Sequence, residues 1–135
     1  MGGIYRTVPV YIRGAQHVPP NYKKVRELMK YFVQDMNIKE FSSVPELAAW
    51  THAEFVKIHP FQDGNGRIGR LILFKECLKY DIVPFIITDD LKMFYYRGIR
   101  EWKTEPGYLT DTCLTAQDHF KALMDYFRIP YNPNA

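Results

Sequence analysis

The sequence has little cysteine, no long hydrophobic run and only a small excess of positive charge. Its two cysteines, Cys77 and Cys113, stand alone without a CxxC spacing. This argues against a disulfide framework or a zinc site and favours a reduced, cytoplasmic setting. No apolar stretch approaches the roughly 20 residues that span a bilayer, so we expect no membrane partner. The 18 basic and 15 acidic residues give a net charge of +3, which does not by itself favour nucleic acid.

The composition is that of a folded protein. Hydrophobic residues make up 47% and aromatic residues 16% of the 135 residues. These values allow a compact core and exclude a mostly disordered chain. Because no linker, repeat or low-complexity stretch divides the sequence, we expect one domain over residues 1–135.

The N-terminal residues favour a β-hairpin over about residues 5–18. Residues 7–12 are rich in β-branched and aromatic side chains, and residues 13–16 resemble a turn. Pro9 restricts the first strand to a sheet edge, and Pro19 and Pro20 end the hairpin.

From residue 21 onward the hydrophobic period is that of a helix. A second helix is predicted to begin at Ser43, which forms a capping box with Glu46, and to stop at His59 because Pro60 follows. We expect a third helix from about Gly64, an extended run over residues 82–87, a fourth helix capped by Thr88, and a fifth over residues 114–127. The predicted class is therefore all-α, a small helical bundle with an N-terminal hairpin. The apolar stripe of the first helix consists of Val25, Leu28, Met29, Phe32, Val33 and Met36.

Residues 59–70 carry the chemistry, and they read HPFQDGNGRIGR. Histidine is the usual general base at neutral pH, and His59 is placed at a helix end. Two glycines at a helix start let backbone N–H groups approach an anion closely. Two arginines three residues apart share a helix face and suit a polyphosphate. One carboxylate, Asp63, together with phosphate oxygens is the usual way to hold Mg²⁺.

Two other interpretations fit parts of this stretch. Gly64, Gly66 and Gly69 match the spacing of a dinucleotide-binding loop, but that loop needs a buried strand before its first glycine. Here residues 59–63 interrupt a helical pattern, so a dinucleotide-dependent oxidoreductase is disfavoured. A purely structural turn is also disfavoured, because so many adjacent residues meet the needs of a phosphate site. A non-catalytic nucleotide-binding or interaction module stays open.

The stretch fits the signature H-x-F-x-D/E-G-N-G-R-x-x-R of Fic-domain proteins at every specified position. The resemblance extends to residues 3–20, which look like the flap hairpin of that family, and to residues 53–58 and 94–96. It implies the Fic fold and an enzyme that transfers AMP from ATP, with Mg²⁺, to a hydroxyl side chain of a target protein.

The resemblance also implies roles for individual residues. His59 would deprotonate the target hydroxyl, Asp63 would hold Mg²⁺, and Phe61 would anchor the loop in the core. Tyr95 and Tyr96 would line the base pocket, although buried core tyrosines are an equal alternative. Gly69 is grouped with the nucleotide-binding residues, and close helix packing explains the presence of a glycine there. The residues expected to hold the phosphates are Gly64, Asn65, Gly66, Arg67 and Arg70.

The predicted hairpin would supply the docking surface for the target. An edge strand has unpaired backbone groups that an extended target segment can bind by β-augmentation. A hairpin that only covers the core is an equal alternative. The docking residues would be Thr7, Val8, Pro9, Val10, Tyr11 and Ile12.

The same resemblance also bears on the nucleotide donor and on the regulation of the enzyme. Relatives that act as kinases depart from Gly64-Asn65-Gly66, so the intact motif favours adenylylation over phosphorylation. Other relatives use different nucleotide donors, so the nucleobase of the donor stays open. Many Fic proteins are restrained by a helix with the pattern S/T-x-x-x-E-G/N, whose glutamate binds the second signature arginine, here Arg70. Only Ser42 and Glu46 have the required spacing, and Leu47 breaks the pattern. We therefore expect an unrestrained, self-modifying chain, with inhibition by a separate partner or by a segment outside it.

Overall fold

The computed structural model describes residues 3–11 and 18–132. The 3-10 turn η1 (Tyr22–Lys24) leads into α1 (Val25–Ile38), which is followed by α2 (Val44–Ile58) and α3 (Asn65–Lys79). The chain then forms α4 (Asp89–Arg100) and α5 (Gly107–Tyr126). All regular secondary structure in the described part of the chain is helical, which confirms the all-α class.

Local capping chemistry explains where α2 begins and ends. The Ser43 hydroxyl accepts the Glu46 backbone N–H at 3.3 Å, as the predicted capping box requires. The Glu46 carboxylate, however, accepts the N–H of Ser42 at 2.8 Å, one residue earlier than expected. At the other end, His59 has a φ of 50° and its N–H bonds to the Phe55 carbonyl at 3.1 Å. The predicted end of the helix before Pro60 is confirmed.

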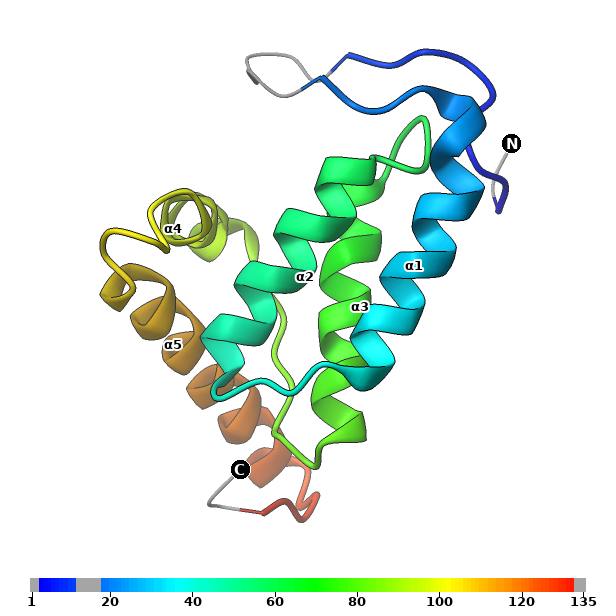
Figure 1. Cartoon of the computed structure of the whole chain (residues 1–135). Helices are drawn as coiled ribbons and strands as arrows, with labels where there is room; N and C mark the ends of the chain where they lie inside the picture. The colour runs from blue at the N-terminus through cyan, green and yellow to red at the C-terminus, as the bar shows by residue number, and fades with distance from the viewer. Residues whose placement is uncertain (1–2, 12–17, 133–135) are drawn as a thin grey trace.

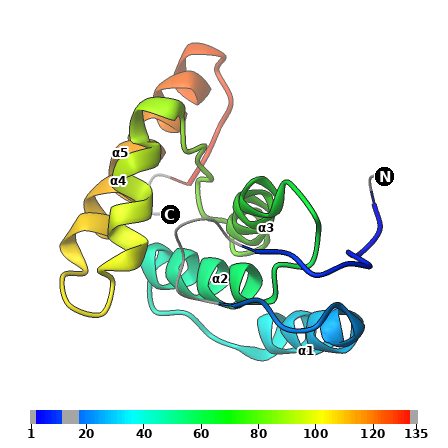
Figure 2. The same cartoon turned by 90° about the horizontal axis from the view of Figure 1, so that it is seen from above.

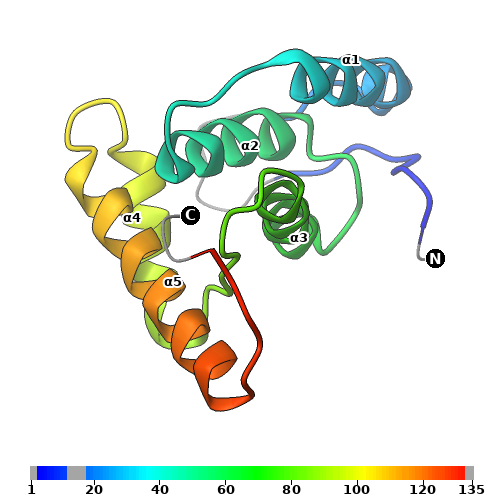
Figure 3. The same cartoon turned by 90° about the horizontal axis from the view of Figure 1, so that it is seen from below.

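The helix α2 lies in the middle of the bundle. Figures 1, 2 and 3 show α1 on one side of α2, the pair α4 and α5 on the other, and α3 alongside it. This arrangement makes α2 and α3 the central elements, and the loop that joins them lies at one end of the bundle, near the N-terminal segment (Figure 1).

Two apolar clusters stabilise the arrangement. One joins α1 to α2, where Phe32 stacks on Trp50 with ring centroids 5.5 Å apart. The other joins α2 and α3 to α4 and α5 and includes Cys77 and Cys113, both free and buried. Burial raises the pKa of each thiol to about 12, so both behave as small apolar side chains. Val33 belongs to the predicted apolar stripe of α1, but it is 44% exposed and so is not part of the core.

The predicted N-terminal hairpin is not observed. Residues 3–11 and 18–20 contain no strand, and the turn at 13–16, together with Ile12, lies outside the described residues. The Arg6 N–H donates to the Pro60 carbonyl at 2.8 Å, so this part of the N-terminal segment bonds to the α2–α3 loop. β-Branched residues favour extended backbone, but a strand also needs a neighbouring strand with which it exchanges hydrogen bonds. Here the neighbour is the α2–α3 loop, and no strand forms.

The run 82–87 is neither helix nor strand. The Gln117 amide on α5 donates to the Val83 carbonyl at 3.0 Å, so a side chain replaces the partner strand. At the start of α4, Thr88 occupies the predicted N-cap position, but its hydroxyl bonds to the Asp90 carboxylate instead of to a backbone N–H. No described helix combines the length and the apolar character needed to cross a bilayer.

Candidate active site

The site is built on the loop between α2 and α3. His59 is the C-cap of α2, in the left-handed region, and its side chain is half-buried. Pro60 follows and is fully buried, which fixes the chain as it leaves the helix. Phe61 packs between Tyr5 and Phe55, with ring centroids 5.7 and 6.5 Å away. The expectation that Phe61 anchors the loop agrees with these contacts.

Asn65 closes this loop from within. Its side-chain oxygen accepts the Phe61 N–H at 3.0 Å, and its amide nitrogen donates to the Phe61 carbonyl at 2.8 Å. Asn65 is only 4% exposed. The sequence pointed to the Asn65 amide as a phosphate ligand, whereas in the structure the amide binds backbone. The two hydrogen bonds make it a clamp on the loop.

The start of α3 has the features of an anion site. Gly64 is the N-cap with a φ of 81°, a value that side chains rarely allow, and no side chain caps the helix. The backbone N–H groups of the first turn are therefore directed outward, at the positive end of the helix dipole. The exposed Asp63 carboxylate accepts the Gly64 N–H at 2.8 Å, which places an acidic group beside this turn.

Arg70 lies one turn along α3 from this helix start. Its Nη1 donates to the Tyr96 hydroxyl at 2.8 Å, which ties α3 to α4. A Cβ at Gly66 would lie 3.2 Å from Arg70 Nη1 and 3.4 Å from the Tyr96 hydroxyl oxygen. The backbone of the first turn of α3, the Arg70 guanidinium and the Tyr96 phenol therefore lie close together.

Arg67 and Arg70 share one edge of a cavity of about 410 Å³. The rest of its lining is apolar and includes Phe74 on α3 and Ile87 in the run 82–87. Two cations beside an apolar hollow fit an anionic ligand that also carries apolar surface. The expectation that both arginines lie on one face of α3 is confirmed.

Two residues grouped with the site have packing roles. Tyr95 is 1% exposed and belongs to the cluster between α2, α4 and α5, and burial raises the pKa of its phenol. This burial favours the alternative of a core tyrosine for Tyr95. Gly69 is buried, and a Cβ there would lie 3.4 Å from Phe55, so close packing of α3 on α2 accounts for it.

Sequence reasoning missed two residues around this site. His52 on α2 lies beside Tyr95 and Tyr96, with ring centroids 6.3 and 5.9 Å away. Burial, and secondarily the charge of Arg70, lower the pKa of His52 to about 4, so it is neutral near pH 7. The other is Arg6, which is 4% exposed and bonds to the end of α2. The sequence could have pointed to Arg6 only through the position of a cation within a mostly apolar run. Nothing in the sequence singled out His52.

Comparison with known proteins agrees with this geometry. The sequence model of the Fic/DOC family matches residues 1–76, which include the complete loop. The chain belongs to the Fic/DOC family. Proteins named "Protein adenylyltransferase Fic" resemble it: that of Drosophila persimilis is 36% identical over 101 residues, covering 73% of this chain and 20% of the relative. The protein of the same name from Aedes aegypti is 38% identical over 98 residues, covering 70% of this chain and 19% of the relative.

This Fic/DOC chain spans about a fifth of the length of the curated relatives that it matches. The matched family region ends within α3, so α4 and α5 lie beyond it. The Arg70 contact to Tyr96 therefore joins the matched region to the part of the fold that follows it.

Proposed function

We propose that this chain is a protein adenylyltransferase that moves AMP from ATP to the hydroxyl of a Ser, Thr or Tyr side chain on a target protein. The observation that carries the proposal is the meeting of Gly66, Arg70 and Tyr96 at the uncapped start of α3, directly after a loop that begins with His59. The relatives named as adenylyltransferases support the same conclusion.

The proposed reaction is an in-line displacement at the α-phosphorus of ATP. His59 takes the proton of the target hydroxyl, whose oxygen forms a new bond to the α-phosphorus. The bond from the α-phosphorus to the oxygen that bridges to the β-phosphorus breaks, and pyrophosphate leaves. Arg67 and Arg70 stabilise the negative charge that builds on the leaving group, and the N–H groups at the start of α3 hold the remaining phosphate oxygens.

Asp63 is the residue that would hold Mg²⁺. Within residues 3–11 and 18–132 no group of three or more His, Cys, Asp or Glu side chains could bind a metal ion. A single exposed carboxylate still suits Mg²⁺, because this ion commonly takes one or two carboxylates and completes its shell with substrate phosphates and water. When bound with ATP, the ion supplies charge neutralisation at the phosphates.

The target would approach along the N-terminal segment. Tyr11 is 87% exposed and Val8 is 40% exposed, so apolar side chains there are open to contact. Docking residues 7–11 remain a proposal, but β-augmentation is no longer part of it for these residues, since they form no strand. An inhibitory partner that places a carboxylate on Arg70 would compete with the Tyr96 hydroxyl.

Transfer from labelled ATP tests the function. The purified chain is incubated with Mg²⁺, cell lysate and ATP labelled at the α-phosphate, and His59→Ala serves as the matched control. Labelled bands are expected with the unmodified chain, and the variant should lose about 10²–10⁴ in rate. Self-modification would add about 329 Da, one adenylate, to the mass of the chain.

The position of the label distinguishes the alternatives. Transfer from the γ-phosphate would identify a kinase and overturn the proposal. Binding of ATP without any transfer would identify a nucleotide-binding module. Transfer that His59→Ala leaves unchanged would remove His59 from the proposed mechanism.

A further inference from the structure

Arg6 makes an unusual set of contacts for a charged residue. It is 4% exposed, and the described residues place no carboxylate within ion-pair distance of it. A buried cation is costly unless its donors are satisfied, and here backbone carbonyls satisfy them. The dipoles of the surrounding backbone carbonyls therefore compensate the charge of Arg6.

Three consecutive carbonyls at the end of α2 accept from Arg6. Its Nε donates to the His59 carbonyl at 2.7 Å, and its Nη2 donates to the Ile58 carbonyl at 3.3 Å. Its backbone N–H donates to the Pro60 carbonyl at 2.8 Å. The last carbonyls of a helix lack partners within the helix and carry the negative end of its dipole, so a guanidinium satisfies them well.

The same guanidinium also binds the N-terminal segment at two places. Its Nη2 donates to the Pro20 carbonyl at 2.5 Å, and its Nη1 donates to the Val8 carbonyl at 3.4 Å. Val8 is one of the proposed docking residues, and Pro20 stands at the end of the predicted hairpin. One side chain thus connects these two parts of the N-terminal segment to the backbone of His59.

We propose that Arg6 is a positioning residue that fixes the backbone of His59 relative to the N-terminal segment on which the target docks. His59 has a φ of 50°, a conformation that residues other than glycine adopt only when their surroundings hold it. Arg6 holds it through the carbonyls before, at and after this residue. Transfer requires the imidazole and the incoming hydroxyl to be aligned, and Arg6 controls both sides of that alignment.

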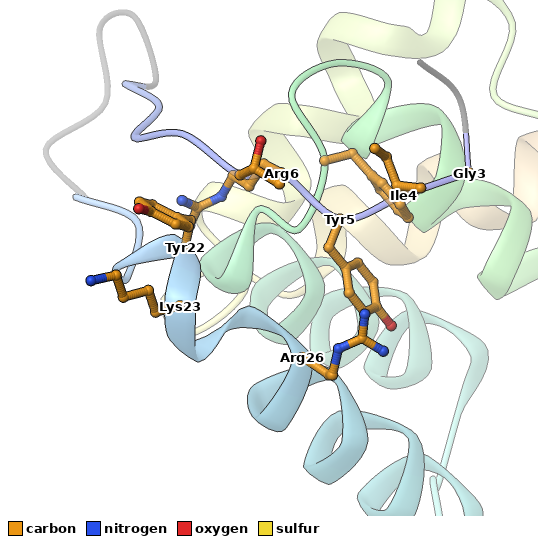
Figure 4. Close-up of a pocket in the computed structure, with 9 residues that line it drawn as sticks. Gly3, Ile4, Tyr5, Arg6, Tyr22, Lys23 and Arg26 are labelled. Carbon is orange, nitrogen blue, oxygen red and sulfur yellow. The ribbon is translucent and has the colours of Figure 1, made fainter.

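This inference rests on the proposed function where it concerns transfer, but its structural part can be measured without nucleotide. The variants are Arg6→Met, which removes the donors, and Arg6→Lys, which keeps the charge. A lysine has no planar fork, so it cannot reach carbonyls on both sides at once. The matched control is Arg26→Met. Arg26 is exposed and lines a cavity of about 670 Å³ that Arg6 also lines. Its guanidinium carbon lies 5.6 Å from the centroid of the Tyr5 ring. Figure 4 shows Arg26 beside the Tyr5 ring and the Arg6 guanidinium near Tyr22.

The first measurement is amide hydrogen exchange without nucleotide. We expect both Arg6 variants to speed exchange in peptides that cover residues 3–11 and 55–62, and to leave the interior of α3 unchanged. Arg26→Met should match the unmodified chain. Faster exchange throughout the chain would show a general loss of stability and would overturn the positioning role.

The second measurement separates binding from transfer. Calorimetry with a non-transferable ATP analogue and Mg²⁺ should give one site per chain and a Kd within about threefold of the unmodified chain, since α3 is intact. When ATP replaces the analogue, kcat should fall about 10²-fold in Arg6→Met, the loss expected from a misplacement of about 1 Å, and by less in Arg6→Lys. An unchanged kcat, or a loss of binding sites equal to the loss of rate, would overturn the proposal.

These experiments distinguish a failure of the proposed function from a failure of the Arg6 inference. If the unmodified chain transfers nothing, the proposed function fails, and the exchange pattern alone still decides whether Arg6 holds the loop. If the Arg6 variants do not fold, NMR of the unmodified chain with labelled arginine decides instead. A hydrogen-bonded Nε–H of Arg6 should exchange slowly with water, and rapid exchange at that position would overturn the inference.

Discussion

Replacing Asn65 by alanine tests whether the loop between α2 and α3 is clamped before any ligand binds. The substitution removes two hydrogen bonds, of 3.0 and 2.8 Å, between the side chain and the backbone of Phe61. Each contributes about 1 kcal/mol, and leaving the Phe61 N–H without its partner costs up to about 1 kcal/mol more, because that residue is only half-buried. We expect the free energy of unfolding to fall by about 2–3 kcal/mol.

The assay for Asn65→Ala is urea unfolding without nucleotide, followed by circular dichroism. Gln62→Ala is the control, because Gln62 is exposed in the same loop and a surface change of this kind moves stability by less than about 0.5 kcal/mol. Asn65→Asp should give an intermediate loss, since it keeps the acceptor and loses the donor. If Asn65→Ala unfolds as the unmodified chain does, the amide is not a clamp and its main role is toward a ligand.

Two further predictions concern the packing behind the site. Gly98→Ala should destabilise the chain by about 2 kcal/mol in the same assay, because the new Cβ would lie 2.7 Å from the Leu109 Cα, a backbone atom that cannot move aside; unchanged stability would mean that α4 and α5 can separate freely. His52 has a pKa of about 4 in the folded chain and about 6.5 unfolded, so the unfolded state binds more protons in this window and stability falls as pH drops from about 6.5 toward 4. His52→Gln should therefore lose about 2 kcal/mol less than the unmodified chain between pH 7 and 4.5 in urea unfolding, and an equal loss would contradict a buried, neutral His52.

The ends of the helices around the site follow from the sequence because their causes are local. Ser43 caps α2, Pro60 prevents its continuation, and Gly64 allows the left-handed turn before α3. Each of these effects involves residues within a few positions of one another. The site loop contains two of these residues, Pro60 and Gly64, so its position could be predicted from the sequence.

The N-terminal segment could not be predicted in the same way because its partner is remote. Its extended, β-branched residues suggest a strand, but the donor that holds it is the side chain of Arg6, which bonds to carbonyls 52 and 53 residues away. The same limit applies to Tyr95 and Tyr96. Adjacent tyrosines look alike in a sequence, and only the packing of α4 on α2 places one in the core and the other on Arg70.

The signature loop thus contains two kinds of residue that the sequence presents as one. Phe61 and Asn65 turn inward and hold the loop, while Asp63, Arg67 and Arg70 keep their charged groups half-buried or exposed. In the proposed function this loop brings a base and a phosphate cradle together, and rigidity would raise the rate because its groups need no reordering when substrate arrives. The inward residues supply that rigidity. Under the proposed function, substitutions among them should lower stability and activity together, whereas substitution of the exposed Arg67 should lower activity alone.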